Sequence, residues 1–166
     1  MQTPLLLTSR ANPRFRSLRD QLSANAGKRT HTLLLGEKLI EAWAEARRSL
    51  AGSRLRPTLW LRLEGAPAHF LEEEMRVDVL ELGDQLMRDL ADAGCAPTHA
   101  LFMEIGAEPS GPLPDRVIVP WAIQDPGNLG AVLRSAAAFG FDQALLGPGC
   151  ADPFSPKALR GSMGAA

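Results

Sequence analysis

The sequence predicts an α/β protein made of two successive units. In residues 12–105, short apolar strand patterns alternate with amphipathic helix patterns, which indicates a compact αβ domain. Residues 117–147 read as strand, Pro-Gly turn, small-residue helix and strand, the parts of a parallel α/β unit. Between them, residues 107–115 (A-E-P-S-G-P-L-P-D) have the composition of a proline-stiffened linker. We therefore expect a domain in residues 1–106, a linker in 107–115 and a second domain in 116–166.

Caps and apolar spacing place the remaining elements. Asn12 can cap a first, basic helix with Pro13 at its first position, and an apolar stripe follows at Phe15, Leu18 and Leu22. Ser155 can cap the last helix in the same way. Strands are expected at residues 32–35, 57–63, 77–80, 99–105, 117–123 and 143–147, and further helices at 36–50, 67–76 and 84–94. The strand at 57–63 alternates apolar and other residues, so we expect one buried face.

The second domain is organised around the turn and helix of residues 125–140 (D-P-G-N-L-G-A-V-L-R-S-A-A-A-F-G). We expect Asn128 to cap this helix and Gly140 to end it. Gly127 and Gly130 would let a ligand or another backbone come close. Because ligands in parallel sheets bind at the carboxyl ends of strands, this turn is the candidate functional site.

The charge is distributed unevenly along the chain. Residues 1–62 carry 12 Lys/Arg against 4 Asp/Glu, whereas residues 63–116 carry 3 against 12. Clustered cations favour a polyanionic partner such as nucleic acid, and the alternative is a solvated surface that binds nothing. The candidate phosphate contacts lie on the first helix and in the turn after it: Arg14, Arg16, Arg19, Lys28 and Arg29.

Several classes of site are excluded or left without support. The chain has no glycine-rich dinucleotide fingerprint, no P-loop and no G-x-S-x-G, and its three histidines lack metal-ligand spacing, so we expect no metal. It contains no apolar run of about 18 residues, and residues 1–7 do not resemble a secretory signal. Cys95 and Cys150 form no C-x-x-C pair, which favours a reducing compartment and a cytoplasmic protein.

Two stretches of the second domain resemble a known family. Asn128 to Arg134 (N-L-G-A-V-L-R) looks like the first motif, N-x-G-x-x-x-R, of the SpoU (TrmH-type) branch of the SPOUT RNA methyltransferases. Residues 153–164 (P-F-S-P-K-A-L-R-G-S-M-G) look like the second motif of that family. From about residue 8 onward, the first domain more loosely resembles the family's RNA-binding domain, which is related to a ribosomal-protein fold.

The resemblance implies an enzyme that transfers a methyl group from S-adenosylmethionine to a ribose 2′-hydroxyl of rRNA or tRNA. It implies a trefoil-knotted α/β fold that works as a homodimer. Arg134 would be the catalytic arginine and Asn128 would shape the turn, while Arg160 and Ser162 would lie at the second motif beside the RNA. The family's third motif and its knot-threading segment, with most of the cofactor-binding residues, are expected beyond Ala166.

Physical chemistry restricts how Arg134 acts. A guanidinium stays protonated, with a pKa above about 12, so it is a poor general base. It can orient an RNA phosphate or stabilise a developing 2′-oxyanion. The alternative for Arg134 is a surface arginine paired with a carboxylate. For the protein, the alternatives are a non-catalytic RNA-binding protein with a vestigial half-domain and, with less support, an unrelated phosphate or nucleotide site.

Overall fold

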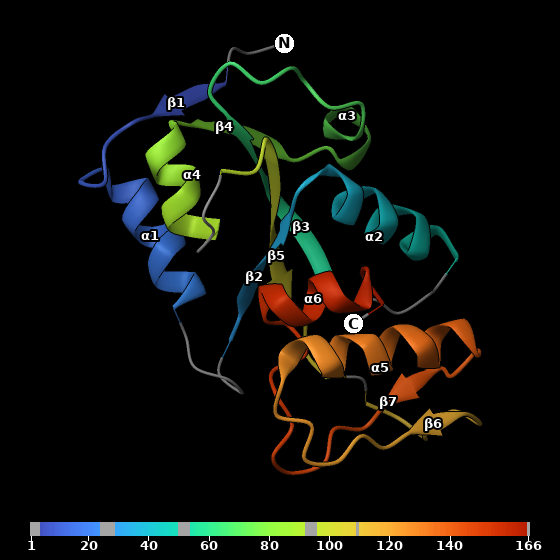
Figure 1. Cartoon of the computed structure of the whole chain (residues 1–166). Helices are drawn as coiled ribbons and strands as arrows, with labels where there is room; N and C mark the ends of the chain where they lie inside the picture. The colour runs from blue at the N-terminus through green and yellow to red at the C-terminus, as the bar shows by residue number, and fades with distance from the viewer. Residues whose placement is uncertain (1–3, 24–28, 50–53, 92–95, 109, 166) are drawn as a thin grey trace.

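A computed structural model describes residues 4–23, 29–49, 54–91, 96–108 and 110–165. Its larger sheet has five strands in the order β1-β4-β3-β5-β2 (Figure 1). The strands are β1 (Leu5–Leu7), β2 (His31–Leu35), β3 (Leu55–Leu63), β4 (Asp78–Leu82) and β5 (His99–Ile105). β4 runs parallel to β1 and β3, whereas β5 runs antiparallel to β3 and β2.

Helices cover both faces of this sheet, as Figure 1 shows. α1 (Pro13–Leu22) and α4 (Asp84–Ala91) pack on one face, and α2 (Glu37–Ser49) and α3 (Leu71–Met75) pack on the other. Asn12 caps α1 as predicted, because its side chain accepts a hydrogen bond from the Arg14 N–H and Pro13 takes the first position. The alternation expected for the first domain is therefore confirmed, with α3 shorter than the range 67–76.

Two features of this sheet differ from the prediction. β3 is buried on both faces, since Trp60 and Leu61 are both fully buried and Arg62 is only 9% exposed. The expectation of one buried face was wrong because β3 lies in the middle of the sheet, between β4 and β5. The edge strand β1 was not predicted. Its three leucines show no alternation of apolar and polar residues, and the strand is held by parallel pairing with β4, which is distant in the sequence.

The second unit has a small parallel sheet and two helices. β6 (Val117–Ile118) pairs with β7 (Gln143–Ala144), and α5 (Pro126–Ala138) connects them. The regular strands are shorter than predicted, although backbone hydrogen bonds continue the pairing: the Gly147 N–H donates to the Pro120 carbonyl at 2.9 Å. Gly140 follows the end of α5 with a φ of +76°, which confirms it as the terminating glycine.

The last helix, α6 (Pro156–Ser162), joins the two units. Ser155 caps it and Pro156 opens it, both as predicted. Phe154 and Leu159 are buried in the core of the larger sheet, on the face that α2 covers, and Figure 1 shows α6 lying between α2 and α5. The second-motif segment therefore packs against both units.

Several large apolar side chains are exposed on the second unit. They include Val119, Trp121, Phe139, Phe141, Leu145 and Leu146, and Trp121 and Phe139 are 66% and 72% exposed. None of the helices in the described part of the chain has the length and apolar character needed to cross a membrane.

Candidate functional site

The candidate site is built on the crossing of α5 and α6. A Cβ added to Gly130 would stand 2.4 Å from the Ala158 carbonyl oxygen and 2.9 Å from the Gly161 Cα. A Cβ at Gly161 would stand 2.9 Å from the Gly127 carbonyl oxygen. The glycines of the two motifs therefore allow two backbones to touch. Of the two uses expected for Gly130, ligand or backbone approach, the structure shows the second.

Asp125 ties the amino-terminal ends of the two helices together. Its side chain caps α5, because one carboxylate oxygen accepts from the Asn128 N–H at 2.9 Å. The other oxygen accepts from the Lys157 ammonium of α6 at 2.6 Å. That hydrogen bond is the main cause that holds the pKa of the Asp125 carboxyl below its usual value. The prediction that Asn128 caps α5 was wrong. Asp125 is the cap, and Asn128 is a first-turn residue whose N–H donates to it.

Asn128 and Arg134 lie on the exposed side of α5, while Leu129 and Leu133 are buried beneath it. Six residues separate them, which is about 9 Å along the helix axis. The Arg134 guanidinium makes no hydrogen bond or ion pair with any residue that the structure describes. The alternative of an arginine paired with a surface carboxylate is thus not seen there, and its five donors face solvent.

The two candidate residues of α6 differ in exposure. Arg160 is exposed, and its guanidinium, like that of Arg134, has no partner among the described residues. Ser162 is only 1% exposed, and its hydroxyl donates to the Leu159 carbonyl at 3.0 Å. The Ser162 backbone also contributes to the close crossing beneath Gly130. In this arrangement the Ser162 side chain is not accessible to RNA, and it contributes to the packing of the two helices instead.

The predicted cations of the first unit differ in their exposure and in their hydrogen bonds. Arg14 and Arg19 are exposed on α1, whereas the exposed Arg16 donates to the Ala11 carbonyl. Arg29 is only 18% exposed and donates to Asp152 at 2.7 Å, so it is a structural residue and not an open phosphate contact.

Two of the sequence predictions concern positions that the structure does not describe. Lys28, a candidate phosphate contact, lies outside the described residues. The cofactor-binding residues were expected beyond Ala166, and Ala166 itself lies outside the described residues as well. The location of the cofactor pocket therefore stays a prediction.

A buried polar network on the larger sheet had no place in the sequence prediction. Arg62 on β3 pairs with Glu72 of α3 at 3.0 Å and with Glu81 of β4 at 2.8 Å. The Trp60 indole N–H donates to the His99 imidazole at 3.0 Å. Arg62 inside an apolar strand pattern was the one available signal, because a buried arginine needs carboxylate partners that sequence spacing does not reveal.

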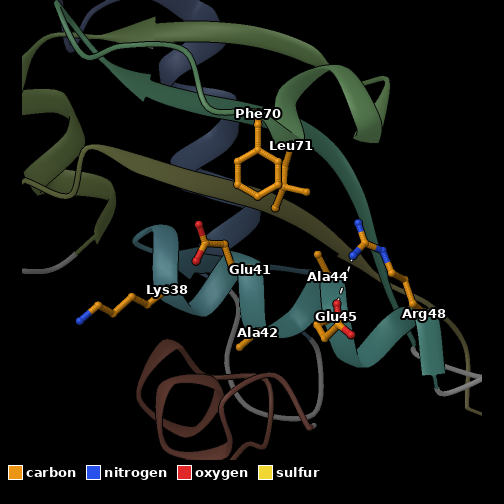
Figure 2. A pocket seen from close by; sticks show the side chains of 8 residues that line it. All are labelled: Lys38, Glu41, Ala42, Ala44, Glu45, Arg48, Phe70 and Leu71. Carbon is orange, nitrogen blue, oxygen red and sulfur yellow. Dashed lines mark hydrogen bonds and ion pairs between the residues drawn. The ribbon is translucent and has the colours of Figure 1, made fainter.

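An open hollow between α2 and the start of α3 is a second concave surface. Figure 2 shows Phe70 and Leu71 above it, with Glu41, Glu45 and Arg48 on its α2 wall. Its charges are mixed, and it contains none of the predicted site residues. The α5–α6 surface remains the candidate site.

Comparisons with known proteins find similar sequences in the same part of the chain. Residues 115–166 match the SpoU rRNA Methylase family. This part of the chain therefore resembles the SpoU family. Human mitochondrial rRNA methyltransferase 3 is 56% identical over 43 residues, which are 26% of this chain and 10% of that protein. RlmP of Bacillus subtilis, a 23S rRNA guanosine 2′-O-methyltransferase, is 49% identical over 49 residues, 30% of this chain and 20% of that protein.

Solved structures extend the likeness in fold to the first unit. An RNA 2′-O ribose methyltransferase superimposes with a TM-score of 0.67 at 27% identity, covering 97% of this chain and 62% of that chain. The SpoU methyltransferase AviRb from Streptomyces viridochromogenes, in complex with AdoMet, gives 0.74 at 22% identity over 93% of this chain and 60% of that one. The α/β fold class is confirmed. The chain spans about three fifths of these solved proteins and a fifth or less of the two curated relatives.

Proposed function

We propose that this chain is part of an enzyme that methylates a ribose 2′-hydroxyl of RNA with S-adenosylmethionine. The observation that carries the proposal is Arg134, an unpaired guanidinium on the exposed side of α5, six residues after Asn128 within the SpoU motif. Relatives support the reaction class, since one is named a 2′-O-methyltransferase and one solved relative carries AdoMet.

The residues of α5 and α6 suit the RNA side of this reaction. Arg134 and Arg160 are cations that match phosphate, whereas the cofactor, which supplies the methyl group, carries a positive sulfonium. The glycine crossing is closed by backbone contact, so it leaves no room for a cofactor between the helices. The cofactor pocket is proposed to lie in segments that follow Ala166.

Arg134 acts as a fixed donor in this proposal. Because it stays protonated, it holds an RNA phosphate or stabilises negative charge that develops on the 2′-oxygen. The 2′-hydroxyl proton goes to another acceptor, and an RNA phosphate is suitable. Holding the 2′-oxygen in line with the methyl group supplies the rest of the acceleration.

The first unit is proposed to deliver the RNA. Arg14 and Arg19 project from α1, which is consistent with phosphate contact, and the basic balance of residues 1–62 would attract the polyanion. We further propose the division into residues 1–106, 107–115 and 116–166, a homodimer that covers exposed apolar side chains of the second unit, and a cytoplasmic location.

The test is methyl transfer by the whole protein to total ribosomal RNA, with Arg134→Ala compared with wild type. Loss of one transition-state donor is expected to lower turnover by about 100-fold or more, with RNA affinity changed less than about threefold. If affinity collapsed while bound RNA still turned over, the role given to Arg134 would be wrong. If calorimetry of the whole protein with S-adenosylmethionine showed no binding, the non-catalytic alternative would hold.

A further inference from the structure

Arg29 connects three segments that are far apart in the sequence. Its Nε donates to the Asp152 carboxylate at 2.7 Å, and its Nη1 donates to the Leu22 carbonyl, at the end of α1, at 2.9 Å. The two charged side chains are 18% and 10% exposed. A charge pair with so little contact with water is stable only where good geometry and further hydrogen bonds compensate for the lost hydration. The relative positions of Arg29 and Asp152 are therefore tightly constrained.

Asp152 passes this constraint on to α6. Its second carboxylate oxygen accepts from the Phe154 N–H at 2.9 Å, and its carbonyl accepts from the Ser155 hydroxyl at 2.9 Å. Ser155 is the residue that caps α6. On β2, the Thr32 hydroxyl donates to the Phe154 carbonyl at 2.6 Å in a buried position. The start of α6 is therefore fixed to both α1 and the larger sheet.

The other end of α6 is equally close-packed. A Cβ on Gly164 would stand 2.9 Å from the Trp43 Cα of α2. Along the middle of α6, the backbone touches α5 at Gly130, and Arg134 follows Gly130 by one helical turn. Backbone contacts of this kind leave no flexible side chain to absorb a shift, so movement of α6 moves Arg134.

We propose that Arg29 and Asp152 are positioning residues, which set the place of Arg134 relative to the RNA-binding face of α1. The pair holds the end of the helix that carries Arg14 and Arg19 against the loop that starts α6. This inference rests on the proposed function, because it concerns how RNA held by the first unit meets Arg134. Neither residue touches RNA in this role.

The direct test measures the distance between α1 and α5. Spin labels are placed at Ser17→Cys and Ser135→Cys, both exposed, in whole protein whose Cys95 and Cys150 are replaced by serine. Asp152→Asn removes the charge but keeps an oxygen for Phe154, and it is expected to broaden or shift a narrow distance distribution. Asp89→Asn is the matched control, because it makes the same charge change at the exposed pair with Arg10. It should leave the distribution unchanged.

Thr32→Val is a second, nearly isosteric variant that removes the hydroxyl bond to Phe154 and should broaden the same distribution if Asp152→Asn does not fold. Melting curves establish that each variant is folded at the temperature of measurement. An unchanged distribution in a folded Asp152→Asn or Thr32→Val protein would overturn the proposal.

Activity separates positioning from general damage. Asp152→Asn should lower kcat at least tenfold with the KM for RNA changed less than about threefold, since small misplacement of reacting groups is costly and α1 itself is intact. A rise in KM with kcat unchanged would contradict a positioning role. If the wild-type protein methylated no RNA, the proposed function would fail, and the distance measurement would still decide whether this pair fixes α1 relative to α5.

Discussion

Gly130 of α5 faces the Ala158 carbonyl of α6 at a distance that excludes any side chain, because a Cβ would stand 2.4 Å from that oxygen. The backbones of these two helices are also in close contact at Gly161. A glycine that the SpoU motif places next to the candidate site is therefore required first by packing.

Gly130→Ala should destabilise the protein. Overpacking a tight contact costs about 1–3 kcal/mol, which corresponds to a fall in Tm of roughly 2–12 °C for a chain of this size. Gly127→Ala is the matched control: its Cβ would meet only the Asp125 carboxylate at 3.0 Å and the Lys157 Cε at 3.4 Å, and both side-chain ends can move. Thermal unfolding of both variants checks this, and equal Tm values would contradict the crossing.

Glu72→Gln should cost more stability than Glu74→Gln, although the two residues lie on the same short helix. The Glu72 side chain is 8% exposed and pairs with the Arg62 side chain, which is 10% exposed and keeps only Glu81 as a carboxylate partner in the variant. Weakening a buried hydrogen bond to a charged group in this way costs about 1.5–3 kcal/mol. Glu74 pairs with Arg48 at the surface, where the loss is below about 1 kcal/mol. Urea unfolding at neutral pH measures both, and similar midpoints would refute the buried network.

His99 should make stability depend on pH in mildly acidic solution. Burial holds the pKa of its imidazole below the ordinary value, although Glu37 and Glu72 favour the charged form, while His69 and Arg62 disfavour it. The unfolded chain therefore binds a proton first, and stability is complete above about pH 6.5 and declines as pH falls toward the lower folded pKa.

His99→Asn retains an acceptor for the Trp60 indole and should remove this decline between about pH 7.5 and 5.5, on either side of the ordinary histidine pKa. His31→Asn, at a partly exposed position, is the control that should keep it. Urea midpoints at the two pH values measure the effect, and a wild-type decline that survives in His99→Asn would assign it to other groups.

Replacing Arg14 and Arg19 by alanine should weaken RNA binding and flatten its salt dependence. Each lost phosphate contact removes about 0.7 from the slope of log affinity against log salt for single-stranded RNA, so the pair removes roughly 1.4. Arg10→Ala is the control, because Arg10 is already paired with Asp89. Titrations of ribosomal RNA between low and moderate salt measure the slope. An unchanged slope in the double variant would show that α1 does not contact phosphates.

What the sequence could predict here was mostly local. The caps at Asn12 and Ser155 and the ending at Gly140 depend on a few neighbouring residues, and they are confirmed. Asn128 was given the cap that Asp125 holds, because both residue types cap helices and the Lys157 contact that orders Asp125 comes from 32 residues away.

The remaining features depend on contacts between distant segments. The sequence predicts Arg29 as an exposed cation. In the structure it pairs with Asp152, which lies 123 residues further along the chain. The motif gave the identities of Arg134 and Ser162, but only packing separates an exposed guanidinium from a buried hydroxyl. β1 forms because it pairs with β4, and its own three residues contain no pattern that predicts this pairing.

The position of Phe154 and Leu159 has a practical consequence for dividing the protein. A cut at residues 107–115 follows the composition of the chain, yet it would strip both side chains from the core that also contains Trp43 and Leu101. The separated first unit would expose to water the part of the core that these two side chains fill, and Arg29 would lose its partner Asp152. Adding residues 150–165 to the first unit as a second chain should restore its protection from proteolysis, as a missing fragment does in a split protein.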